Sequence, residues 1–590
     1  MFRIHFVAVI VALTIASADC RGEKPNIILI FSDDHGYTDL GVQGIRDDLK
    51  TPHLDKLAKG GVRFTNGYVS APQCVPSRAG LLTGIYQNRF GVEANKHPLD
   101  GFGKSLTIAE RLKKVGYVTG MTGKWHLGPA SEIVKHGFDW VYYKNSQRPG
   151  WSNYGLDGNK REPGPENSKL YHIDANSRAT CAFIEKNHRN PFFFYCAYRA
   201  PHVPLDAPKK YLDRFKGKMP QRRRQALAMI SAMDDGVGEI MKTLRRFQLE
   251  EKTLVFFIGD NGAPLKIHKI DAPGGGPGWD GSLNDPLNGE KGMLSEGGIR
   301  VPFVASWKGK IPAGQVFDRP VISLDVAATA VSMAGVQEDP QLDGTDLIPW
   351  LTKSVSKVPD RKLYWRWVSQ SAIRQGKWKF LKGGSYEYLF DLKQDPEEKN
   401  NLIKSKPEIA KRLKKDLVEW SADLKPPGIT KTGQASTWNR YFEHYLEGNP
   451  EPRPKQAPVA ASVDGWLCRN GTLKKEKGKL VVTGKGKNPF LVRNQISLTP
   501  GSSVELQIES RKQGHVGVSW RAVGQRDFNN EQVVFKQVSA SENLQTVKLK
   551  MDSDKKVIHL RILLPNREVQ IQSIRFVDKE DSQTQRWNFD

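Results

Sequence analysis

The chain has little cysteine for its length. Its 590 residues include only five cysteines: Cys20, Cys74, Cys181, Cys196 and Cys468. So few cysteines cannot form a dense disulfide framework, and an odd number leaves at least one of them unpaired within the chain. A small disulfide-stapled scaffold is therefore excluded, and the chain is long enough for two or more hydrophobic cores.

Long apolar runs are also missing beyond the first residues, so we expect no membrane span. Residues 1–18 have the pattern of a signal peptide. Arg3 gives a positive start, Phe6–Ile15 is a short apolar core, and Ala16–Ala18 is the small-x-small pattern that precedes cleavage. This pattern predicts an exported protein, either secreted or periplasmic.

The chain lacks a concentrated basic tail and the usual nucleic-acid-binding motifs. It has 89 Lys and Arg against 64 Asp and Glu, a formal net charge of +25, but the excess is spread along the chain. There is no zinc-finger spacing, no aromatic RNA-recognition signature and no basic zipper. We therefore expect no nucleic-acid partner, and the charge favours another anionic partner such as a sulfated or carboxylated glycan or an anionic lipid.

Three continuous apolar runs are present, and each is followed by polar residues: Asn26–Phe31, Pro191–Ala197 and Thr253–Ile258. Runs without alternation are typical of strands covered on both faces of a parallel sheet. Helical patterns lie between them, including a capping box at Thr107–Glu110 and a long stretch over 225–249. The sequence predicts an α/β fold with a mostly parallel sheet sandwiched by helices, and a ligand site outside the carboxyl ends of the strands.

The pattern changes twice toward the C-terminus. After Pro349, short strand candidates with tight turns precede a helical stretch that begins at Pro407. From Val463 onward, strands with period-two alternation predict a β-sandwich. The predicted organisation is a signal peptide (1–18), a catalytic α/β domain (23–350), a small antiparallel subdomain (351–424), a linker (425–462) and a β-sandwich (463–580).

The most specific motif is Cys-Val-Pro-Ser-Arg at Cys74–Arg78, continued by Ala-Gly-Leu-Leu-Thr-Gly. Helical spacing of Leu81, Leu82 and Ile85 places Cys74 at a helix N-terminus, where free N–H groups favour an anion. With its continuation, the string resembles the type I sulfatase family of the alkaline phosphatase-like superfamily, and the resemblance extends over about residues 24–424. It implies that formylglycine-generating machinery oxidises Cys74 to formylglycine, whose hydrate is the nucleophile.

Two pairs of oxygen ligands follow buried strands: Asp33 with Asp34, and Asp260 with Asn261. Carboxylate and amide oxygens suit calcium, or magnesium as a second choice, rather than zinc. The sulfatase family has its calcium ligands at these positions. The resemblance therefore implies one calcium ion held by these four residues and the residue derived from Cys74.

Further residues match the family position by position. Gly123–Gly128 is similar to the family's second signature, in which Lys124 would bind a sulfate oxygen and His126 would orient or deprotonate a hydroxyl of the hydrate. His202, in Ala-Pro-His-Val-Pro, matches the residue that protonates the departing alcohol. Lys291 matches a second sulfate-binding lysine, and Arg78 is expected to hold the formylglycine.

The resemblance predicts an exported sulfatase that hydrolyses sulfate esters, and the basic charge favours a sulfated carbohydrate substrate. Two alternatives stay open at this point. One is a phosphonate or phosphodiester hydrolase of the same superfamily, and the other is an inactive binder of sulfated glycans. The loops expected to select the substrate are His136–Pro165 and Ile267–Asn288.

The role of the β-sandwich also has two interpretations. Lysine clusters at Lys474–Lys477 and Lys485–Lys487 would attract a sulfated chain, and Trp466 and Trp520 would supply a stacking platform. Alternatively, the tryptophans belong to the core of a packing module and the lysines are solvated.

Overall fold

The computed structural model describes residues 24–146, 150–265, 281–336, 339–355, 357–426, 441–450 and 462–589, the last with short gaps at 485–487, 494–495, 524, 526–527, 529–530 and 581. The predicted signal peptide, Cys20 and most of the predicted linker lie outside the described residues. None of the helices described is long and apolar enough to cross a membrane. The chain divides into two compact units, Met1–Pro452 and Arg453–Asp590.

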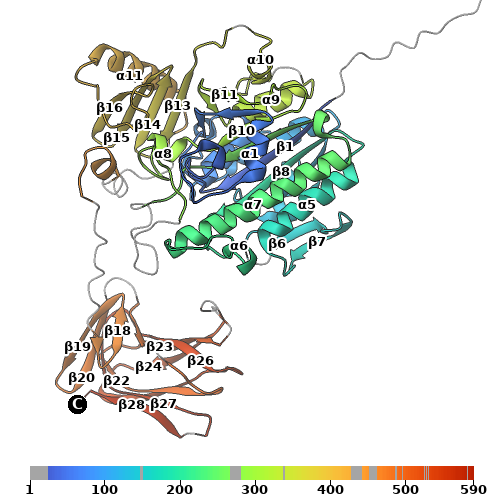
Figure 1. The fold of residues 1–590 in the computed structure, drawn as a ribbon. Helices are drawn as coiled ribbons and strands as arrows, with labels where there is room; N and C mark the ends of the chain where they lie inside the picture. Colours follow the sequence, from blue (N-terminus) through green and yellow to red (C-terminus); the bar gives the residue numbers. More distant parts are fainter. Residues whose placement is uncertain are drawn as a thin grey trace, which may run out of the picture. The chain divides into compact units, whose positions relative to one another are not determined.

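A ten-stranded sheet forms the centre of the first unit, with the order β11-β2-β10-β9-β1-β8-β4-β5-β6-β7 (Figure 1). Its strands are β1 (Asn26–Asp33), β2 (Val62–Phe64), β4 (Val118–Gly123), β5 (Trp140–Tyr143), β6 (Gly150–Tyr154), β7 (Lys160–Glu166), β8 (Phe192–Pro201), β9 (Thr253–Gly259), β10 (Phe303–Ser306) and β11 (Gln315–Phe317). The five central strands from β9 to β5 are parallel, whereas β10, β6 and β7 join their neighbours antiparallel. The predicted α/β class is confirmed, with antiparallel pairs on either side of the parallel centre.

Two hydrophobic cores cover the two faces of this sheet, and the fully buried β1 contributes to both. Ile27 and Leu29 belong to one core, and Ile28 and Ile30 to the other. This explains why the sequence of β1 is apolar without alternation. The described helices are α1 (Pro52–Lys59), α2 (Cys74–Thr83), α3 (Asp100–Gly103), α4 (Ile108–Lys113), α5 (His172–Asn187), α6 (Lys209–Leu212), α7 (Gln221–Arg246), α8 (Glu296–Ile299), α9 (Asp325–Met333), α10 (Ile348–Leu351) and α11 (Pro407–Ala422).

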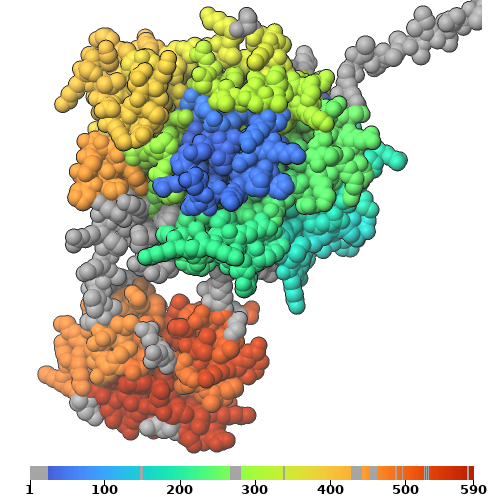
Figure 2. Space-filling view, in the orientation of Figure 1, coloured from blue at the N-terminus to red at the C-terminus, as the bar shows by residue number. Residues whose placement is uncertain are grey.

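The helices pack as two layers. Residues of α1, α5 and α7 belong to one core, and residues of α2, α4 and α9 belong to the other. Helices α1 and α7 are far apart in the sequence but contact each other, as the blue and green surfaces in Figure 2 show. The predicted capping box before α4 is confirmed, because Thr107 and Glu110 each accept a hydrogen bond from the other's backbone N–H.

A four-stranded antiparallel sheet follows in the same unit, as the sequence indicated. It consists of β13 (Lys362–Trp367), β14 (Gln370–Gln375), β15 (Trp378–Gly383) and β16 (Tyr386–Asp391). One face packs on α11 in a small core of its own, and the other contributes Trp365 and Trp367 to a core of the large sheet. A buried ion cluster also crosses this interface: Lys379 Nζ on β15 lies 2.9 Å from a carboxylate oxygen of Glu296 and 2.9 Å from one of Glu398.

The second unit is a sandwich of two antiparallel sheets, β17-β18-β21-β26-β23-β24 and β19-β20-β27-β22-β25, with β28 paired to β27. Its strands are β17 (Ser462–Val463), β18 (Trp466–Arg469), β19 (Gly471–Glu476), β20 (Lys479–Gly484), β21 (Phe490–Arg493), β22 (Ser503–Ser510), β23 (Gly514–Ala522), β24 (Val533–Val538), β25 (Ser541–Lys550), β26 (Val557–Leu563), β27 (Glu568–Val577) and β28 (Gln583–Asn588). Trp466 and Trp520 are 0% and 4% exposed and belong to the core. The interpretation that they form a stacking platform is therefore wrong, because both side chains pack inside the sandwich.

Candidate active site

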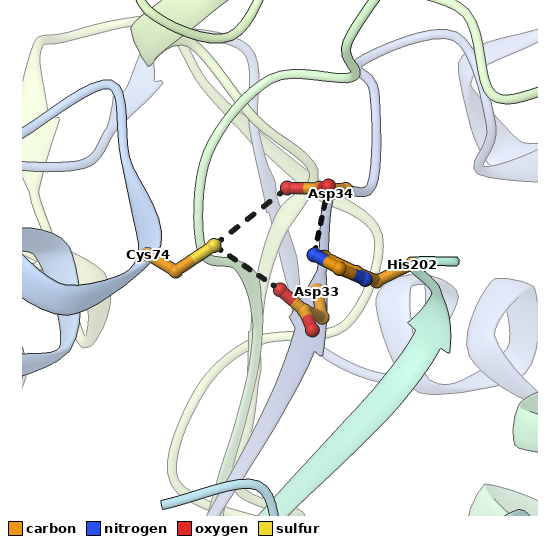
Figure 3. A group of neighbouring side chains, drawn as sticks. All are labelled: Asp33, Asp34, Cys74 and His202. Carbon is orange, nitrogen blue, oxygen red and sulfur yellow. Dashed lines mark hydrogen bonds and ion pairs between the residues drawn. The ribbon is translucent and has the colours of Figure 1, made fainter. Parts of the chain in front are cut away.

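Strand and helix ends bring the predicted site residues together at one edge of the large sheet. Asp33 ends β1, Cys74 begins α2, and His202 follows β8. In Figure 3, the side chains of Asp33, Asp34, Cys74 and His202 face one another. One potential ligand atom from each of these four lies within 4.8 Å of the others.

Hydrogen bonds join the Asp33–Asp34 pair directly to the Asp260–Asn261 pair. Asp34 has a positive φ of 56°, a conformation that aspartate adopts more readily than most residues. Its backbone N–H donates to Asp260 Oδ1 at 2.9 Å, and Asn261 Nδ2 donates to Asp34 Oδ1 at 2.7 Å. Because β1 and β9 are parallel neighbours, the residues that follow them meet at the same edge.

The oxygen atoms of this cluster fit a hard cation. Asp34 Oδ2 and Asn261 Oδ1 are buried and have no hydrogen-bond partner, which is costly unless another group binds them. Burial and the charge of Asp33 raise the pKa of Asp260 to about 7, although Arg78 lies against it. Buried carboxylate and amide oxygens that lack a hydrogen-bond partner are the kind of ligand that Ca²⁺ or Mg²⁺ prefers.

Arg78 connects helix α2 to the acidic cluster. Its guanidinium is fully buried, and Nη2 lies 2.8 Å from Asp260 Oδ2. Nη1 donates to the Lys124 carbonyl at 3.0 Å and to the Tyr195 hydroxyl at 3.1 Å. Tyr195, on β8, was not singled out in the sequence. In the sequence, Tyr195 is one more residue of a buried strand. Its contact with Arg78 spans 117 residues, so no local pattern signals it.

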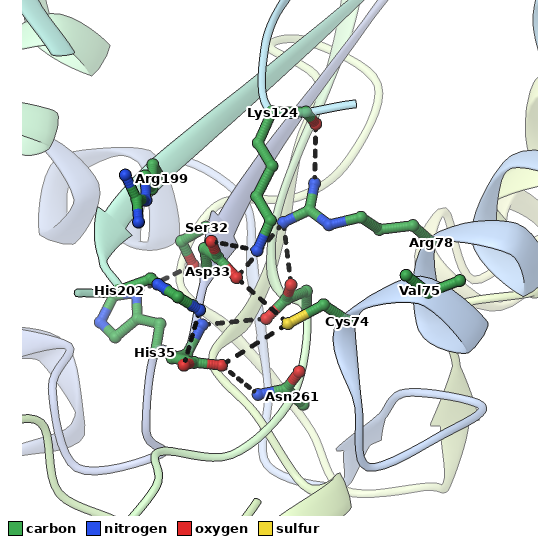
Figure 4. A network of polar contacts seen from close by, with 12 residues as sticks. Ser32, Asp33, His35, Cys74, Val75, Arg78, Lys124, Arg199, His202 and Asn261 are labelled. Atoms are coloured by element: carbon green, nitrogen blue, oxygen red, sulfur yellow. Dashed lines mark hydrogen bonds and ion pairs between the residues drawn. The ribbon is translucent and has the colours of Figure 1, made fainter. Parts of the chain in front are cut away.

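Two buried lysines pair with the carboxylates beside Cys74. Lys124 Nζ lies 2.6 Å from Asp33 Oδ2, and Lys291 Nζ lies 2.5 Å from Asp34 Oδ1 and 3.2 Å from Cys74 Sγ. Burial alone would raise the pKa of Asp33, but Lys124 and His202 outweigh it and hold that pKa well below its usual range. Figure 4 shows Lys124, Arg78 and Asp33 converging beside Cys74.

A glycine positions Lys124. Gly123 has a φ of 84°, and a Cβ at this position would lie 1.9 Å from the Ala197 carbonyl oxygen. This close approach lets the Lys124 N–H donate to the carbonyl oxygen of Ala197, within β8, at 2.8 Å. The backbone therefore requires glycine before Lys124, because only glycine fits both the positive φ and the close contact with Ala197.

The two histidines differ in their surroundings. His126 is exposed, and its partial burial together with the charges of Lys124 and Arg78 lowers its pKa to about 3. Burial lowers the pKa of His202 to about 4, against the opposing effect of Asp33 and Asp34. His202 Nδ1 lies 2.6 Å from the Val203 carbonyl oxygen, so Nδ1 carries the proton, and Nε2 lies 3.6 Å from Asp34 Oδ2.

Cys74 is the first residue of α2 and is 1% exposed. Its Sγ lies 3.5 Å from Asp33 Oδ1 and 3.8 Å from Asp34 Oδ1. Burial and the charge of Asp260 raise the pKa of its thiol. The unmodified side chain is therefore a neutral thiol, which is a poor nucleophile.

His53, Asp234 and Asp235 form a second group of potential metal ligands. Both aspartates of this group already have protein partners. The two oxygens of Asp234 accept the backbone N–H groups of His53 and Leu54 at the start of α1. Asp235 forms an ion pair with Arg214 at 2.7 Å. These residues stabilise the contact between α1 and α7.

Comparison with known proteins matches most of the first unit to the family that the Cys74 motif resembles. The model of the Sulfatase family matches residues 25–336, and that of the N-sulphoglucosamine sulphohydrolase C-terminal family matches residues 289–423. The chain is 33% identical to N-acetylgalactosamine-6-sulfatase of Mus musculus over 391 residues, 60% of this chain and 72% of that protein. It is 30% identical to arylsulfatase J of Mus musculus over 484 residues, 68% of this chain and 77% of that protein.

Solved structures agree with the sequence relatives. The crystal structure of Ps i-CgsB in complex with k-i-k-neocarrahexaose is 32% identical, with a TM-score of 0.61, and the match covers 71% of this chain and 97% of that one. The crystal structure of PsFucS1 sulfatase from Pseudoalteromonas sp. is 26% identical with a TM-score of 0.53. From these matches and the arrangement around Cys74, the chain belongs to the sulfatase family and is a sulfuric ester hydrolase.

Proposed function

We propose that this sulfatase is exported, carries formylglycine at position 74, uses one calcium ion and acts on a sulfated carbohydrate. The observation that carries the proposal is the position of Cys74. It lies in the Cys-x-Pro-Ser-Arg string at the N-terminus of α2, 3.2 Å from Lys291 Nζ and beside the oxygens of Asp33 and Asp34. A formylglycine here would supply a hydrated aldehyde, in which one hydroxyl attacks sulfur and the other later expels sulfate.

The lysines and the helix end neutralise the substrate's charge. A sulfate ester repels nucleophiles because its oxygens are negatively charged, and this charge spreads further in the transition state. Lys124 and Lys291 are 4% and 3% exposed, so their ammonium groups act in a site from which most water is excluded. Cys74 is the first residue of α2, so the positive end of the helix dipole acts at position 74, while the Val75 N–H donates to Asn95 Oδ1.

The acidic cluster is the proposed calcium site. Asp33, Asp34, Asp260 and Asn261 offer oxygen atoms, and two of these atoms, Asp34 Oδ2 and Asn261 Oδ1, are buried without a hydrogen-bond partner. The residue at position 74 would complete the ligand set. When bound, calcium would hold the nucleophile and a sulfate oxygen in place and offset the repulsion between the carboxylates. Arg78, fixed by Tyr195 and Asp260, keeps the helix end in register with this site.

His202 is the proposed proton donor to the leaving oxygen. Its Nδ1–H donates to the Val203 carbonyl, so Nε2 is the atom that faces the site. With a pKa of about 4 it is neutral in the free protein near pH 7, and a bound sulfate anion would favour its protonated form. His126, with a pKa of about 3, is neutral in the free protein and can accept a hydrogen bond from a hydroxyl at position 74; a bound sulfate anion would raise its pKa and make it a better base.

A sulfated carbohydrate is the substrate class with most support. One relative is named for the 6-sulfate of N-acetylgalactosamine, and one structural neighbour was solved with a neocarrahexaose. The net charge of +25 suits a polyanion. Of the two proposed substrate loops, residues 147–149 and 267–280 lie outside the described part of the chain.

Sulfate release from defined sulfated oligosaccharides tests this function. We expect hydrolysis of at least one sulfated galactan or aminosugar and of a small aryl sulfate, and little hydrolysis of the matching phosphate esters. A preference for phosphate diesters or phosphonates over sulfates would contradict the proposal. So would binding of sulfated glycans without any turnover by protein that carries formylglycine.

A further inference from the structure

The two sheets of the sandwich differ in charge. The six strands β17, β18, β21, β23, β24 and β26 contain Arg469, Arg493, Arg521, Lys536 and Arg561 but no Asp or Glu. The strands of the other sheet contain seven Lys or Arg and five Asp or Glu. An acid-free sheet is unexpected, because surface charges of opposite sign are usually interspersed.

The strand register shows which side chains of the acid-free sheet point outward. Leu491, Ile562 and Val518 are paired across neighbouring strands and belong to the core. The alternate positions therefore face away from the core. Two rows of directly paired residues lie on that outer face: Arg469, Phe490, Leu563, Gly517 and Phe535 in one, and Leu467, Val492, Arg561, Ser519 and Val533 in the other.

Aromatic and cationic groups interleave on this face. Phe535 is 52% exposed, and its ring lies over Gly517, where an added Cβ would come within 2.5 Å of Phe535 Cδ1. The Arg561 guanidinium stacks on Phe490 at 5.2 Å and on Phe528 at 3.9 Å. Arg521 Nη2 donates to His559 Nδ1 at 2.7 Å; these two residues are paired two positions along from Ser519 and Arg561 on the same strands.

We propose that this outer face binds a sulfated polysaccharide chain. We call it the basic face and define it by Arg469, Phe490, Arg521, Phe535, His559 and Arg561. The choice of a sulfated glycan rests on the proposed function, because the catalytic unit would act on the same polymer. The basic face replaces Trp466 and Trp520, which are buried, as the proposed contact surface.

The chemistry of the basic face matches such a ligand. Guanidinium groups bind oxyanions through two parallel N–H bonds, and stacking on Phe490 and Phe528 holds that of Arg561 in one plane. Exposed aromatic surface such as Phe535 packs against the C–H faces of sugar rings. The absence of acidic residues in the six strands removes the repulsion that a polyanion would meet on the other sheet.

Affinity electrophoresis of the full chain tests the proposal. A Cys74→Ala background prevents turnover during the run, and native gels contain either carrageenan or the unsulfated galactan agarose. We expect retardation by carrageenan alone. Arg521→Gln/Arg561→Gln should raise the apparent Kd at least fivefold, whereas Lys474→Gln/Lys475→Gln, which removes the same charge from the other sheet, should change it less than twofold.

Phe535→Ala provides a second variant that leaves the charge unchanged. We expect it to weaken carrageenan binding several-fold and Phe535→Tyr to restore it, while the melting temperature reports any loss of packing on Gly517. In chains that retain Cys74, every one of these variants should hydrolyse a small aryl sulfate at the wild-type rate. This readout separates a failure of the proposed function from a failure of the basic face.

Three outcomes would overturn the proposal. Equal losses in the two double variants would show that binding follows net charge alone, and retardation by agarose would show that sulfate is not recognised. A dimer in solution that Arg521→Gln/Arg561→Gln dissociates would show that the basic face joins two copies of the chain.

Discussion

Replacing Lys379 tests how the four-stranded sheet is held on the catalytic sheet. Lys379 is fully buried between Glu296 and Glu398, at 2.9 Å from each carboxylate. Lys379→Met keeps most of the side-chain volume but leaves two carboxylates without their shared cation. Removing one partner of a buried ion pair costs about 3–5 kcal/mol, so we expect a loss of that order in the free energy of unfolding near pH 8.

The effect should depend on pH with a definite sign. Burial raises the pKa of Glu398 to about 7, whereas that of Glu296 is about 2, because Lys379 outweighs burial there. Between about pH 4.5 and 7 the folded protein keeps the Glu398 proton that the unfolded chain releases, so this group's contribution falls as pH rises. Without Lys379 both carboxylates take up protons more readily, and the variant should recover part of its stability at pH 5.

Urea unfolding of the first unit at pH 5 and pH 8 measures this effect. Lys377→Met is the matched control, since Lys377 is 47% exposed, pairs with Asp391 and lies two residues away. We expect the control to lose no more than about 1 kcal/mol at either pH. Lys379→Met/Glu398→Gln should be more stable than Lys379→Met at pH 8. Equal losses for Lys377→Met and Lys379→Met, or a Lys379→Met loss independent of pH, would refute the reasoning.

Three further predictions concern the site and the sandwich. Chelation should abolish activity and calcium should restore it best, and Asp260→Ala should lose both bound calcium and turnover; unchanged metal content would contradict the calcium assignment. His202→Ala should lose more rate on a sugar sulfate than on an activated aryl sulfate, because a poorer leaving group needs its proton more; equal losses would indicate positioning. A chain ending at Pro458 should keep turnover on a small sulfate ester and lose affinity for long sulfated polysaccharide, most at low salt; unchanged affinity would favour a packing module.

Much of the site was predictable because its residues follow recognisable strands. The apolar runs of β1 and β9 placed Asp33–Asp34 and Asp260–Asn261 at one sheet edge, and the spacing after Cys74 predicted the helix that begins there. The capping box at Thr107 fixed the start of α4. These features depend on local pattern and on the rule that parallel strands end together.

Contacts between distant segments were not predictable. Tyr195 reaches Arg78 across 117 residues, and Lys379 reaches Glu296 across 83 residues, so no local pattern signals either pair. The sequence left Trp466 and Trp520 open between an outer platform and the core, because alternation alone does not say which of the two phases is inward. The basic face becomes visible only when the strand register aligns residues from five strands.

The most direct test of the central claim compares the chemistry of residue 74 with activity. Mass spectrometry of the peptide that contains residue 74 measures the fraction in which the cysteine sulfur is replaced by the aldehyde oxygen of formylglycine. Preparations made with different amounts of the maturation machinery provide a range of fractions. We predict that the specific rate of sulfate release rises in proportion to this fraction. The rate should extrapolate to zero when no formylglycine is present. Full activity in protein whose Cys74 remains an unmodified thiol would contradict the account.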